Sequence, residues 1–385
     1  MKNRILLVLS HILVALIATA LTLFVIVGQA GSTYSKLDQL EDLIMEVFIG
    51  EADKTKMEDA AANAMVDSLG DRWSYYISAA DYGAYMEQMK NAYVGVGITV
   101  QERKDGTGLD VMAVTAGGPA EEAGILAGDV IVGVEGERIA GQNANDISAK
   151  IKGEEGTSVS LMILRGGEEL TVSVMRRQIK VPVATYKMLP DGIGLITIEN
   201  FDERCASESI TAIEELMKQG ATKLIFDVRN NPGGYKDELV ELLDYLVPEG
   251  LIFRAEYYNG KVEDDSSDAR ELNVPMAVVV NENSYSAAEF FPAALRDYGK
   301  AVIVGQQTSG KGYFQSTYQL KDGSAVGLSI GKYYTPKGVS LANVGITPDI
   351  EVEVGDEIYA QIYYGTLDSM EDPQIQAAME ALKDK

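Results

Sequence analysis

The hydrophobic pattern begins with one long apolar run and then takes on a helical period. The run ILLVLSHILVALIATALTLFVIVG covers residues 5–28, and a helix of that length spans roughly 36 Å, enough to cross a bilayer. Residues 36–92 place apolar side chains at helical spacing, as in LDQLEDLIMEVF and in KMEDAAANAMVDSL, which stops at Gly70. We therefore expect a membrane segment over 1–31 and a helical region over 32–92.

The next segment changes to the period of β-strands. Between residues 93 and 177, short alternating runs such as VGITVQ, LDVMAV, DVIVGV and LTVSVM are separated by turns such as KDGTG and RGG. One helical stretch, ANDISAKIK at 144–152, interrupts them. The pattern predicts a small β-rich module over 93–178.

Strands and helices alternate in the following part of the chain. The apolar runs IGLITIEN, KLIFDVR and MAVVVN are each followed by a helical pattern, and AVIVG adds one more strand. This rhythm is typical of an α/β layer fold with a largely parallel sheet. We assign the core to 179–352 and a tail with one further helix, DPQIQAAMEALK, to 353–385.

Charge affects both the expected topology and the expected partners. Lys2 and Arg4 precede the apolar run and acidic residues follow it, which keeps the N-terminus in the cytoplasm and exports the rest. The run is longer than the ~7–15 apolar residues of a cleaved signal peptide, although GQA at 28–30 would suit a signal peptidase. We expect a single-pass anchor in the cell membrane with extracytoplasmic domains. The formal net charge of −25 argues against a nucleic-acid partner.

Histidine is absent from the exported part of the chain. The single histidine, His11, lies inside the apolar run, and the single cysteine, Cys205, allows no intrachain disulfide. A Ser-His-Asp or Cys-His mechanism and a histidine-bound zinc are therefore excluded there. Any nucleophile must find its base among Lys, Asp, Glu and Tyr.

A serine follows the apolar run AVVV at the start of a helical pattern. In SAAE, Ser286 and Glu289 have the spacing of a capping box, and this local pattern favours a helix cap over a nucleophile. Alternatively, a strand, a tight turn and a helix start expose the hydroxyl beside N–H groups that stabilise an oxyanion. Ala287 and Ala288 leave room for a substrate. One residue can satisfy both interpretations.

Two glycine-bearing loops supply further candidates. In GQQTSGKGYFQ, Lys311 would ordinarily be solvated, but burial lowers a lysine pKa by up to ~3–5 units and would let it act as a general base. Gln315 lies on the same side by periodicity. In FDVRNNPGG, Gly233 and Gly234 either form only a sharp loop or bring N–H groups to an oxyanion hole.

One further serine and lysine pair has a known catalytic spacing. SIGK at 329–332 matches the S-x-x-K of penicillin-binding enzymes, which places both residues one helical turn apart. Its context, GLSIGKYYT, alternates like a strand, and no S-D-N element is present. We therefore reject this pair as the catalytic one.

The β-rich module carries its own binding pattern. YVGVGI at 93–98 is an apolar strand with two glycines, and GGPAEEAGILAGDVIVGVEGERI at 117–139 contains a helix start, a Gly-Asp turn and a strand. A groove between a strand and a helix can hold a peptide as an added strand, and free N–H groups in a glycine loop can bind its terminal carboxylate.

Together these motifs resemble one protein family. GPAEEAGILAGDVI resembles the PDZ domains of bacterial proteases. IGLITIENF, LIFDVRNNPGG, NSYSAAEFF, TSGKGYFQ and YYTPKGVSLANVGITPDI occur in the order found in carboxy-terminal processing peptidases, also called tail-specific proteases. SLGDRWSYY and DPQIQAAMEALK are similar as well, so the resemblance runs from about residue 36 to the end.

The resemblance implies a crotonase/ClpP-like α/β core with an inserted PDZ domain, and a serine endopeptidase of the Ser-Lys type without metal or cofactor. Ser286 matches the nucleophile, Lys311 the base and Gln315 the residue that orients the lysine. The resemblance also implies protein or peptide substrates with a free C-terminus and, by analogy, a homodimer. The remaining implied residues are Ala287, Gly233 and Gly234 for the oxyanion hole, Val94, Gly95, Val96, Gly97 and Ile98 for the PDZ peptide-binding loop, and Arg176 or Arg177 for gating.

Two positions depart from the family pattern. Tyr285 stands where a small residue is usual, and Ser309 replaces the usual aromatic residue before Gly-Lys. A membrane-tethered PDZ protein that binds C-terminal peptides without cutting them is therefore the alternative. The Ser-Lys-Gln set is intact, so we favour a membrane-anchored endopeptidase that cleaves proteins near their C-terminal tails.

Overall fold

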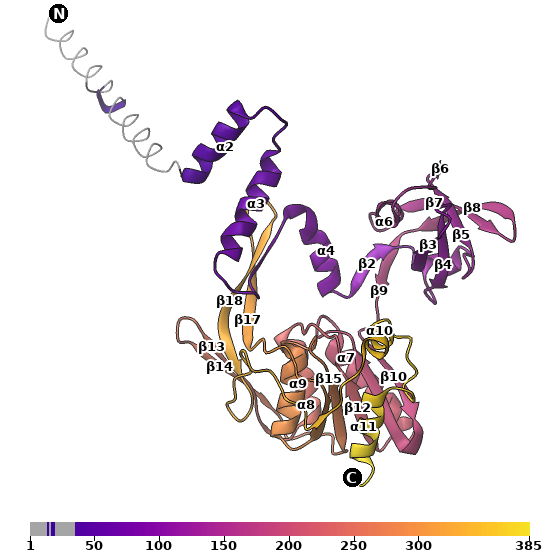
Figure 1. Cartoon of the computed structure of the whole chain (residues 1–385), viewed down its shortest axis with the longest axis vertical. Coiled ribbons are helices and arrows are strands. Elements are labelled where there is room, and N and C mark those ends of the chain that lie inside the picture. Colours follow the sequence, from indigo (N-terminus) through magenta and orange to yellow (C-terminus); the bar gives the residue numbers. More distant parts are fainter. Residues whose placement is uncertain (1–13, 15–16, 20–34) are drawn as a thin grey trace, which may run out of the picture. The chain divides into compact units, whose positions relative to one another are not determined.

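The computed structural model describes residues 14, 17–19 and 35–385. The described residues fall into two units, the first up to Tyr76 and the second Ile77–Lys385, and Figure 1 colours them along the sequence. Within the described residues, no helix is both long enough and apolar enough to cross a membrane. The expected membrane segment, residues 5–28, falls outside the described part except for 14 and 17–19, so the anchor stays a prediction.

The first unit contains two capped helices, α2 (Lys36–Val47) and α3 (Lys54–Asp67). Ser35 and Asp38 form a reciprocal capping box at the start of α2. The Asp53 carboxylate caps α3 by accepting the backbone N–H of Lys56 at 3.1 Å. Both helices lie where the sequence predicts helices, whereas a strand at 75–77 in the same region was not predicted. A short strand, β1 (Tyr75–Ile77), spans the boundary between the units.

The β-rich module of the second unit follows helix α4 (Ala79–Met89). Its sheet has the order β3-β4-β5-β7-β8, with β6 paired to β5, and Leu109, Ile131, Leu161 and Ile163 are fully buried in its core. The elements of the module are β2 (Ala92–Gly95), β3 (Ile98–Glu102), β4 (Leu109–Val114), α5 (Pro119–Glu122), β5 (Val130–Val134), β6 (Glu137–Arg138), α6 (Ala144–Ile151), β7 (Ser158–Arg165), β8 (Glu168–Met175) and β9 (Arg177–Lys180).

The two ends of the module come together in a short ladder. β2 and β9 pair antiparallel from Ala92 opposite Lys180 to Gly95 opposite Arg177. At the base of this ladder the Arg204 guanidinium donates hydrogen bonds to three backbone carbonyls, those of Lys90 (2.8 Å), Asn91 (3.2 Å) and Val181 (2.6 Å). One side chain of the α/β core therefore binds both linker strands.

The α/β core is built on a six-stranded sheet of order β10-β11-β12-β15-β16-β19, of which Figure 1 labels β10, β12 and β15. All neighbours are parallel except β10 and β11, so the expected largely parallel sheet is confirmed. Its elements are β10 (Ala184–Leu189), η1 (Pro190–Gly192), β11 (Ile193–Ile198), α7 (Cys205–Lys218), β12 (Lys223–Asp227), α8 (Lys236–Leu246), β15 (Met276–Val280), α9 (Ala287–Asp297), β16 (Ala301–Gly305), β19 (Ile350–Glu351), α10 (Asp356–Tyr363) and α11 (Pro373–Leu382).

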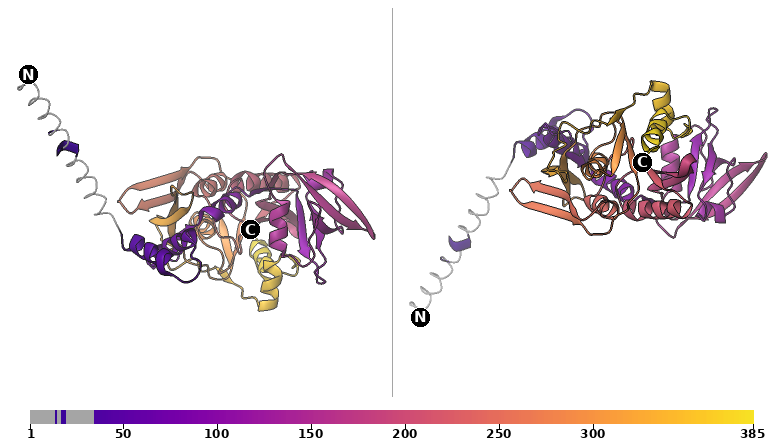
Figure 2. Two further views of the ribbon diagram at one scale, coloured as in Figure 1. Left: turned by 90° about the horizontal axis from the view of Figure 1, so that it is seen from above. Right: turned by 90° about the horizontal axis from the view of Figure 1, so that it is seen from below.

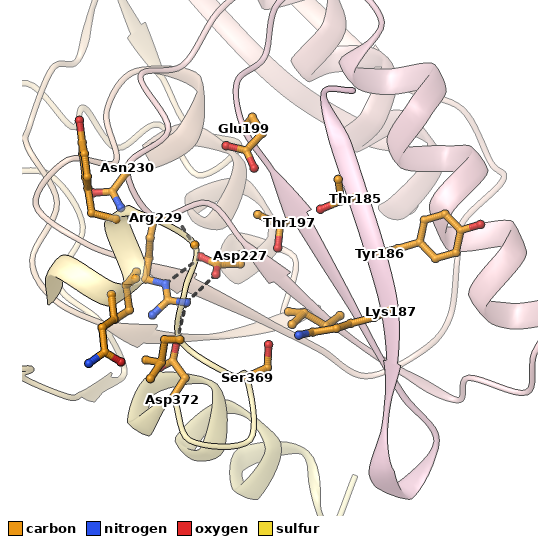
Figure 3. A pocket seen from close by; sticks show the side chains of 16 residues that line it. Thr185, Tyr186, Lys187, Thr197, Glu199, Asp227, Arg229, Asn230, Ser369 and Asp372 are labelled. Atoms are coloured by element: carbon orange, nitrogen blue, oxygen red, sulfur yellow. Dashed lines mark hydrogen bonds and ion pairs between the residues drawn. The ribbon is translucent and has the colours of Figure 1, made fainter. Parts of the chain in front are cut away.

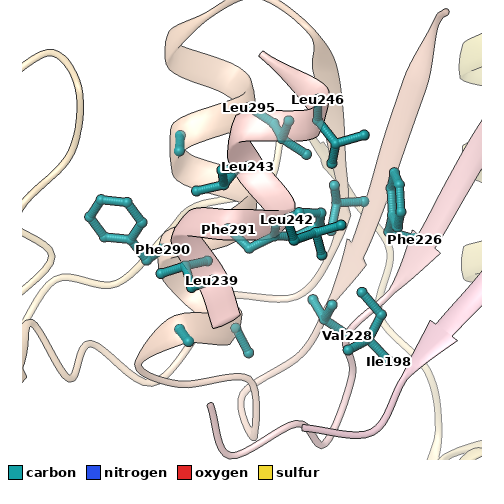
Figure 4. Packing of buried hydrophobic residues seen from close by; sticks show 14 of the residues in the cluster. Ile198, Phe226, Val228, Leu239, Leu242, Leu243, Leu246, Phe290, Phe291 and Leu295 are labelled. Carbon is teal, nitrogen blue, oxygen red and sulfur yellow. The ribbon is translucent and has the colours of Figure 1, made fainter. Parts of the chain in front are cut away.

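Helices cover both faces of this sheet. Apolar side chains of α7, α8 and α9 pack on one face, where Phe291 of α9 meets Phe226 of β12 edge to face at 5.2 Å (Figure 4). Ile375, Ala378 and Leu382 of α11 pack with residues of the other face. Because α9 is anchored by so many buried side chains, its N-terminus is held firmly at the carboxyl edge of the sheet.

A second, antiparallel sheet completes the core. In it, β18 pairs with both β17 and β13, and β13 pairs with β14. The hairpin of β13 and β14 extends from the core (Figure 2). These strands are β13 (Gly250–Tyr257), β14 (Val262–Ser267), β17 (Tyr313–Gln319) and β18 (Ala325–Tyr334). The strand expected around SIGK is confirmed, because all four residues lie within β18.

Candidate active site

Ser286 lies where the loop after β15 enters α9. Its backbone has φ 61° and ψ −121°, a conformation that is costly for any residue with a Cβ and that recurs at functional sites. Two hydrogen bonds fix this loop to the segment after β12: Ser284 Oγ donates to the Val228 carbonyl at 2.7 Å, and the Tyr285 N–H donates to the Asn231 carbonyl at 3.2 Å. The surrounding structure therefore stabilises a strained serine at the N-terminus of a helix.

The glycine pair after β12 packs directly against Ser286. A Cβ on Gly233 would lie 2.7 Å from Ser286 Cβ and 2.9 Å from the Ala287 nitrogen, so only glycine allows this approach. The Gly233 N–H donates to Asn231 Oδ1 at 2.8 Å. Over residues 35–385, the N–H groups of Gly234 and Ala287 have no hydrogen-bond acceptor. Two free donors thus remain around the serine.

The carboxylate of Glu289 joins the serine loop to the lysine loop. Glu289 is fully buried in the first turn of α9, and it accepts the backbone N–H of Ser286 at 3.1 Å, which is the glutamate half of the expected capping box. It also accepts Thr308 Oγ1 (2.5 Å) and the N–H groups of Gly310 (2.6 Å) and Lys311 (2.9 Å). One buried acid therefore fixes the backbone on both sides of the site.

One contact of each of the side chains of Lys311 and Gln315 describes where they lie. Lys311 Nζ lies 5.8 Å from the ring centroid of Tyr285, the bulky residue noted before the serine. Gln315 Nε2 donates to Ser329 Oγ at 2.9 Å, across the β17–β18 pair in which these two residues are opposite each other. Ser329, the serine of the rejected S-x-x-K stretch, thus supports Gln315.

The β-rich module has a small groove at the expected peptide loop. A cavity of about 120 Å³ is lined by four of the five predicted residues, Gly95, Val96, Gly97 and Ile98, whereas Val94 is not part of the lining. Val100, Ile151 and Lys152 belong to the same lining, and Lys152 Nζ lies 5.2 Å from the Tyr93 ring centroid. The groove is mostly apolar with one cation at its edge.

The two arginines proposed for gating are both bound within the module. Arg176 donates to the carbonyls of Lys150 (2.9 Å) and Ile151 (2.8 Å), the last carbonyls of α6. Arg177 forms an ion pair with Glu122 at 2.9 Å. Arg176 therefore caps the C-terminus of α6, and Arg177 links β9 to α5.

Comparisons with known proteins identify the family. The family model for Peptidase family S41 matches residues 192–352, and a PDZ domain model matches 111–165. The carboxy-terminal processing protease CtpA of Bacillus subtilis (strain 168) is 34% identical over 377 residues, which cover 94% of this chain and 80% of that protein. The chain belongs to peptidase family S41. It is a carboxy-terminal processing serine peptidase with a PDZ domain.

Other members of family S41 agree with this assignment. A probable CtpA-like serine protease of Staphylococcus aureus (strain COL) is 32% identical over 330 residues, covering 84% of this chain and 65% of that protein. This chain therefore spans somewhat under two thirds of the length of that relative. A solved structure of a putative S41 protease from Bacteroides fragilis NCTC 9343 shares the fold, with a TM-score of 0.53, 18% identity and coverage of 90% and 97% of the two chains.

A buried charged cluster around Arg229 was missed by the sequence analysis. Arg229 lies between Asp227 (2.6 Å) and Asp372 (2.8 Å), and all three side chains are nearly buried (Figure 3). Burial by itself would lower the pKa of Arg229, but the two carboxylates raise it above its ordinary value. The only available signal was the charged pair in FDVR at the end of a buried strand.

This cluster borders a cavity of about 360 Å³ between β10–β12 and the segment before α11 (Figure 3). Glu199 also lines the cavity, and burial followed by the charge of Asp227 raises the pKa of its carboxyl group. Ser286, Lys311 and Gln315 are not part of its lining. The cavity is therefore separate from the serine site.

Proposed function

We propose that this S41 peptidase is a membrane-anchored, extracytoplasmic endopeptidase that cuts proteins near their C-terminal tails with a Ser-Lys dyad. Ser286 Oγ attacks the peptide carbonyl, and Lys311 Nζ takes the proton and later passes it to the leaving amine. Water then hydrolyses the acyl-enzyme. Gln315 orients Lys311, and no metal or cofactor takes part.

The observation that carries this proposal is the strained Ser286 beside two unengaged N–H groups. The donors of Ala287 and Gly234 suit the charge that develops on the carbonyl oxygen during attack, and Gly233 shapes the loop that brings them close. Glu289 fixes the backbone at both Ser286 and Lys311, so the two reacting residues share one rigid support.

A digestion time course tests the catalytic assignment. The full-length protein in detergent should cleave an unstructured protein, and Ser286→Ala or Lys311→Ala should reduce the rate to background. Lys337→Ala, which changes an exposed lysine, serves as the control and should leave the rate unchanged. Turnover retained in either active-site variant would refute the dyad. Peptide binding without cleavage by the wild type would support the non-catalytic alternative.

We also propose that the PDZ groove captures the substrate's free C-terminus. The apolar lining favours an apolar last residue, and the loop at Val96 and Gly97 can bind the terminal carboxylate, with Lys152 adding a positive charge at the edge. A peptide with a free carboxylate should bind at least about tenfold more tightly than its C-terminal amide, because the amide lacks the charge. Equal affinities would contradict this role.

We further propose that the PDZ domain gates the active site, and two contacts near its linker support this. The Phe201 N–H donates to the Gly233 carbonyl at 2.7 Å, and Arg204, three residues later, binds both linker strands of the domain. A shift of the linker would thus reach the glycine loop beside Ser286. Deletion of residues 93–177 should change the rate or the cleavage sites, and identical digestion patterns would remove the gating proposal.

Location and assembly form the last part of the proposal. Residues 5–28 would anchor the chain, so protease treatment of intact spheroplasts should degrade the domains beyond residue 31. Complete protection would contradict the exported topology. A homodimer should appear in light scattering as twice the chain mass of 41.6 kDa plus bound detergent, and a monomeric mass would exclude it.

A further inference from the structure

Tyr333 carries a buried hydroxyl group without a partner. Tyr333 is 3% exposed, and its hydroxyl oxygen Oη has no hydrogen-bond partner among the described residues. The ring is fixed by Phe253 at 5.7 Å and by Phe290 at 5.5 Å between centroids. A buried, unpaired hydroxyl destabilises the fold, whereas phenylalanine would fill the same space without that cost. The hydroxyl therefore calls for an explanation beyond packing.

The groups around this hydroxyl belong to the active site. Burial and the charge of Glu289 raise the pKa of Tyr333, while the Gly312 backbone and the Ser286 hydroxyl lie near enough to lower it in part. Neither of these two neighbours is in hydrogen-bonding geometry with Oη in this structure. With its pKa above the ordinary value, the phenol keeps its proton at neutral pH and can only act as a donor toward an anion.

The position of Tyr333 is set by the same loop that carries the lysine. The Tyr333 N–H donates to the Gly312 carbonyl at 3.4 Å, and Gly312 directly follows Lys311. Gly312 has no space for a side chain, because its Cβ would lie 2.1 Å from the Ala342 nitrogen. The backbone hydrogen bond thus holds Tyr333 against the loop that carries Lys311, and the contact of its ring with Phe290 holds it against the first turns of α9, the helix that begins directly after Ser286.

We propose that Tyr333 is a further catalytic residue whose hydroxyl donates a hydrogen bond to Ser286 Oγ when a peptide is bound. This inference rests on the proposed Ser-Lys mechanism and adds one group to it. A small rotation of the serine side chain or shift of its loop would satisfy the unpaired donor, and catalytic hydrogen bonds are often long before substrate binds.

The bond would act at one stage of the reaction. As Lys311 Nζ takes the proton from Ser286 Oγ, negative charge gathers on that oxygen before its new bond to the carbonyl carbon forms. The Tyr333 O–H bond stays intact and its dipole stabilises this charge. Once Oγ becomes an ester oxygen it is a weaker acceptor, so the hydrogen bond is stronger in the transition state than in the acyl-enzyme.

Replacement of Tyr333 by phenylalanine separates catalysis from packing. In the full-length protein, Tyr333→Phe should lower kcat at least about tenfold with KM within about twofold, by comparison with the ~10²–10³-fold loss seen for an oxyanion-hole donor. Labelling of Ser286 by a fluorophosphonate should slow by a similar factor. The melting temperature should stay equal or rise, because the variant loses an unpaired buried hydroxyl.

Two controls make the result decisive. Tyr334→Phe removes the hydroxyl of the next residue, which donates to Glu256 at 2.9 Å, and should leave kcat unchanged. If Tyr333→Phe lowers the melting temperature, 3-fluorotyrosine at position 333 keeps the ring and changes only the acidity of the phenol, and kcat should still respond. Wild-type kcat in Tyr333→Phe, with Ser286→Ala inactive, would overturn this inference alone. Cleavage that persists in Ser286→Ala would instead overturn the proposed function.

Discussion

The carboxylate of Glu289 accepts the backbone N–H of Lys311 at 2.9 Å, although 22 residues separate them in the chain. The same side chain accepts the N–H of Ser286, so the spacing of the proposed nucleophile and the proposed base depends on a group that has no part in the proposed bond breaking. Positioning of this kind has large effects on rate, because a displacement of about 1 Å can cost about 10²-fold.

Replacement of Glu289 should therefore affect both folding and turnover. The Glu289 carboxylate accepts four hydrogen bonds from the protein. In Glu289→Gln one of its oxygens becomes an NH₂ group, so at least one of these four donors loses its acceptor. We expect the free energy of unfolding to fall by roughly 1–3 kcal/mol and kcat/KM to fall at least about tenfold. Urea denaturation and peptide hydrolysis measure the two effects. Glu241→Gln, at an exposed position of α8, is the control, and equal behaviour of both variants would contradict the assignment.

Addition of one methyl group at Gly233 should remove activity. Alanine would place its Cβ against Ser286 Cβ and the Ala287 nitrogen, besides the roughly 1–2 kcal/mol that a left-handed backbone costs a residue with a side chain. Gly220→Ala is a matched control, since its φ of 96° resembles the 90° of Gly233 but its Cβ would meet nothing within 4 Å. Both variants should lose similar backbone stability, and only Gly233→Ala should lose hydrolysis. Normal hydrolysis by Gly233→Ala would mean that the loop relaxes easily.

The buried carboxyl group of Asp202 should destabilise the fold at neutral pH. Burial raises its pKa from 3.8 to about 7, and the charges of Glu238 and Glu203 add to the effect. The folded state thus holds this proton more tightly than the unfolded state, so stability falls as the pH rises from about 4 to about 7 and then levels off. Asp202→Asn should raise the free energy of unfolding by roughly 1–3 kcal/mol at pH 8, with a smaller gain at pH 5.

The pH dependence of this gain is the critical measurement. Urea denaturation at both pH values gives it directly, and Asp384→Asn at an exposed position provides the control. A loss of stability in Asp202→Asn at pH 8 would show that the carboxylate is stabilising in the folded protein. A constant gain at both pH values would assign the effect to packing rather than to ionisation.

Removal of Arg229 should release the C-terminal helix. In Arg229→Met, the carboxylates of Asp227 and Asp372 remain buried without their cation, which typically costs about 3–5 kcal/mol. Because Asp372 caps α11, we expect faster hydrogen exchange over 373–382 as well as a lower free energy of unfolding. Arg270→Met provides the control, since Arg270 is 90% exposed and pairs only at the surface. Unchanged exchange in α11 would contradict the proposed link.

Most of the core could be predicted because its burial produces regular periods in the sequence. The parallel strands are continuous apolar runs and α7, α8 and α9 follow them with helical spacing, so order and type were both evident. The strand β14, by contrast, has the sequence VEDDSS, which carries no strand signal. It forms because β13 offers a pairing edge and Arg254 binds Asp264 across the hairpin at 2.6 Å. Such a strand depends on tertiary pairing rather than on its own pattern.

The active site was predictable only in part for a similar reason. Local spacing identified Glu289 as a capping residue, but its bonds to Thr308 and Gly310 join loops that only the fold brings together. Tyr333 opens the motif YYTPKGVSLANVGITPDI, but the motif gave it no role, because a strand in which a tyrosine is buried looks the same whether its hydroxyl is used or not. Family resemblance supplies residue types and their order, whereas the support of each residue requires the packed structure.

The ladder of β2 and β9 brings the two ends of the PDZ domain together, so the domain could in principle be exchanged as one unit. Its entry and exit strands leave the α/β core side by side, and the Val181 N–H donates to the Asn91 carbonyl at 2.8 Å at the point of departure. A domain that binds different C-terminal sequences could be inserted there without changing the path of the chain through the core. Alternatively, a two-residue turn could join the two strands directly. Exchange of the inserted domain at these two strands would therefore give the same catalytic core a different set of substrates.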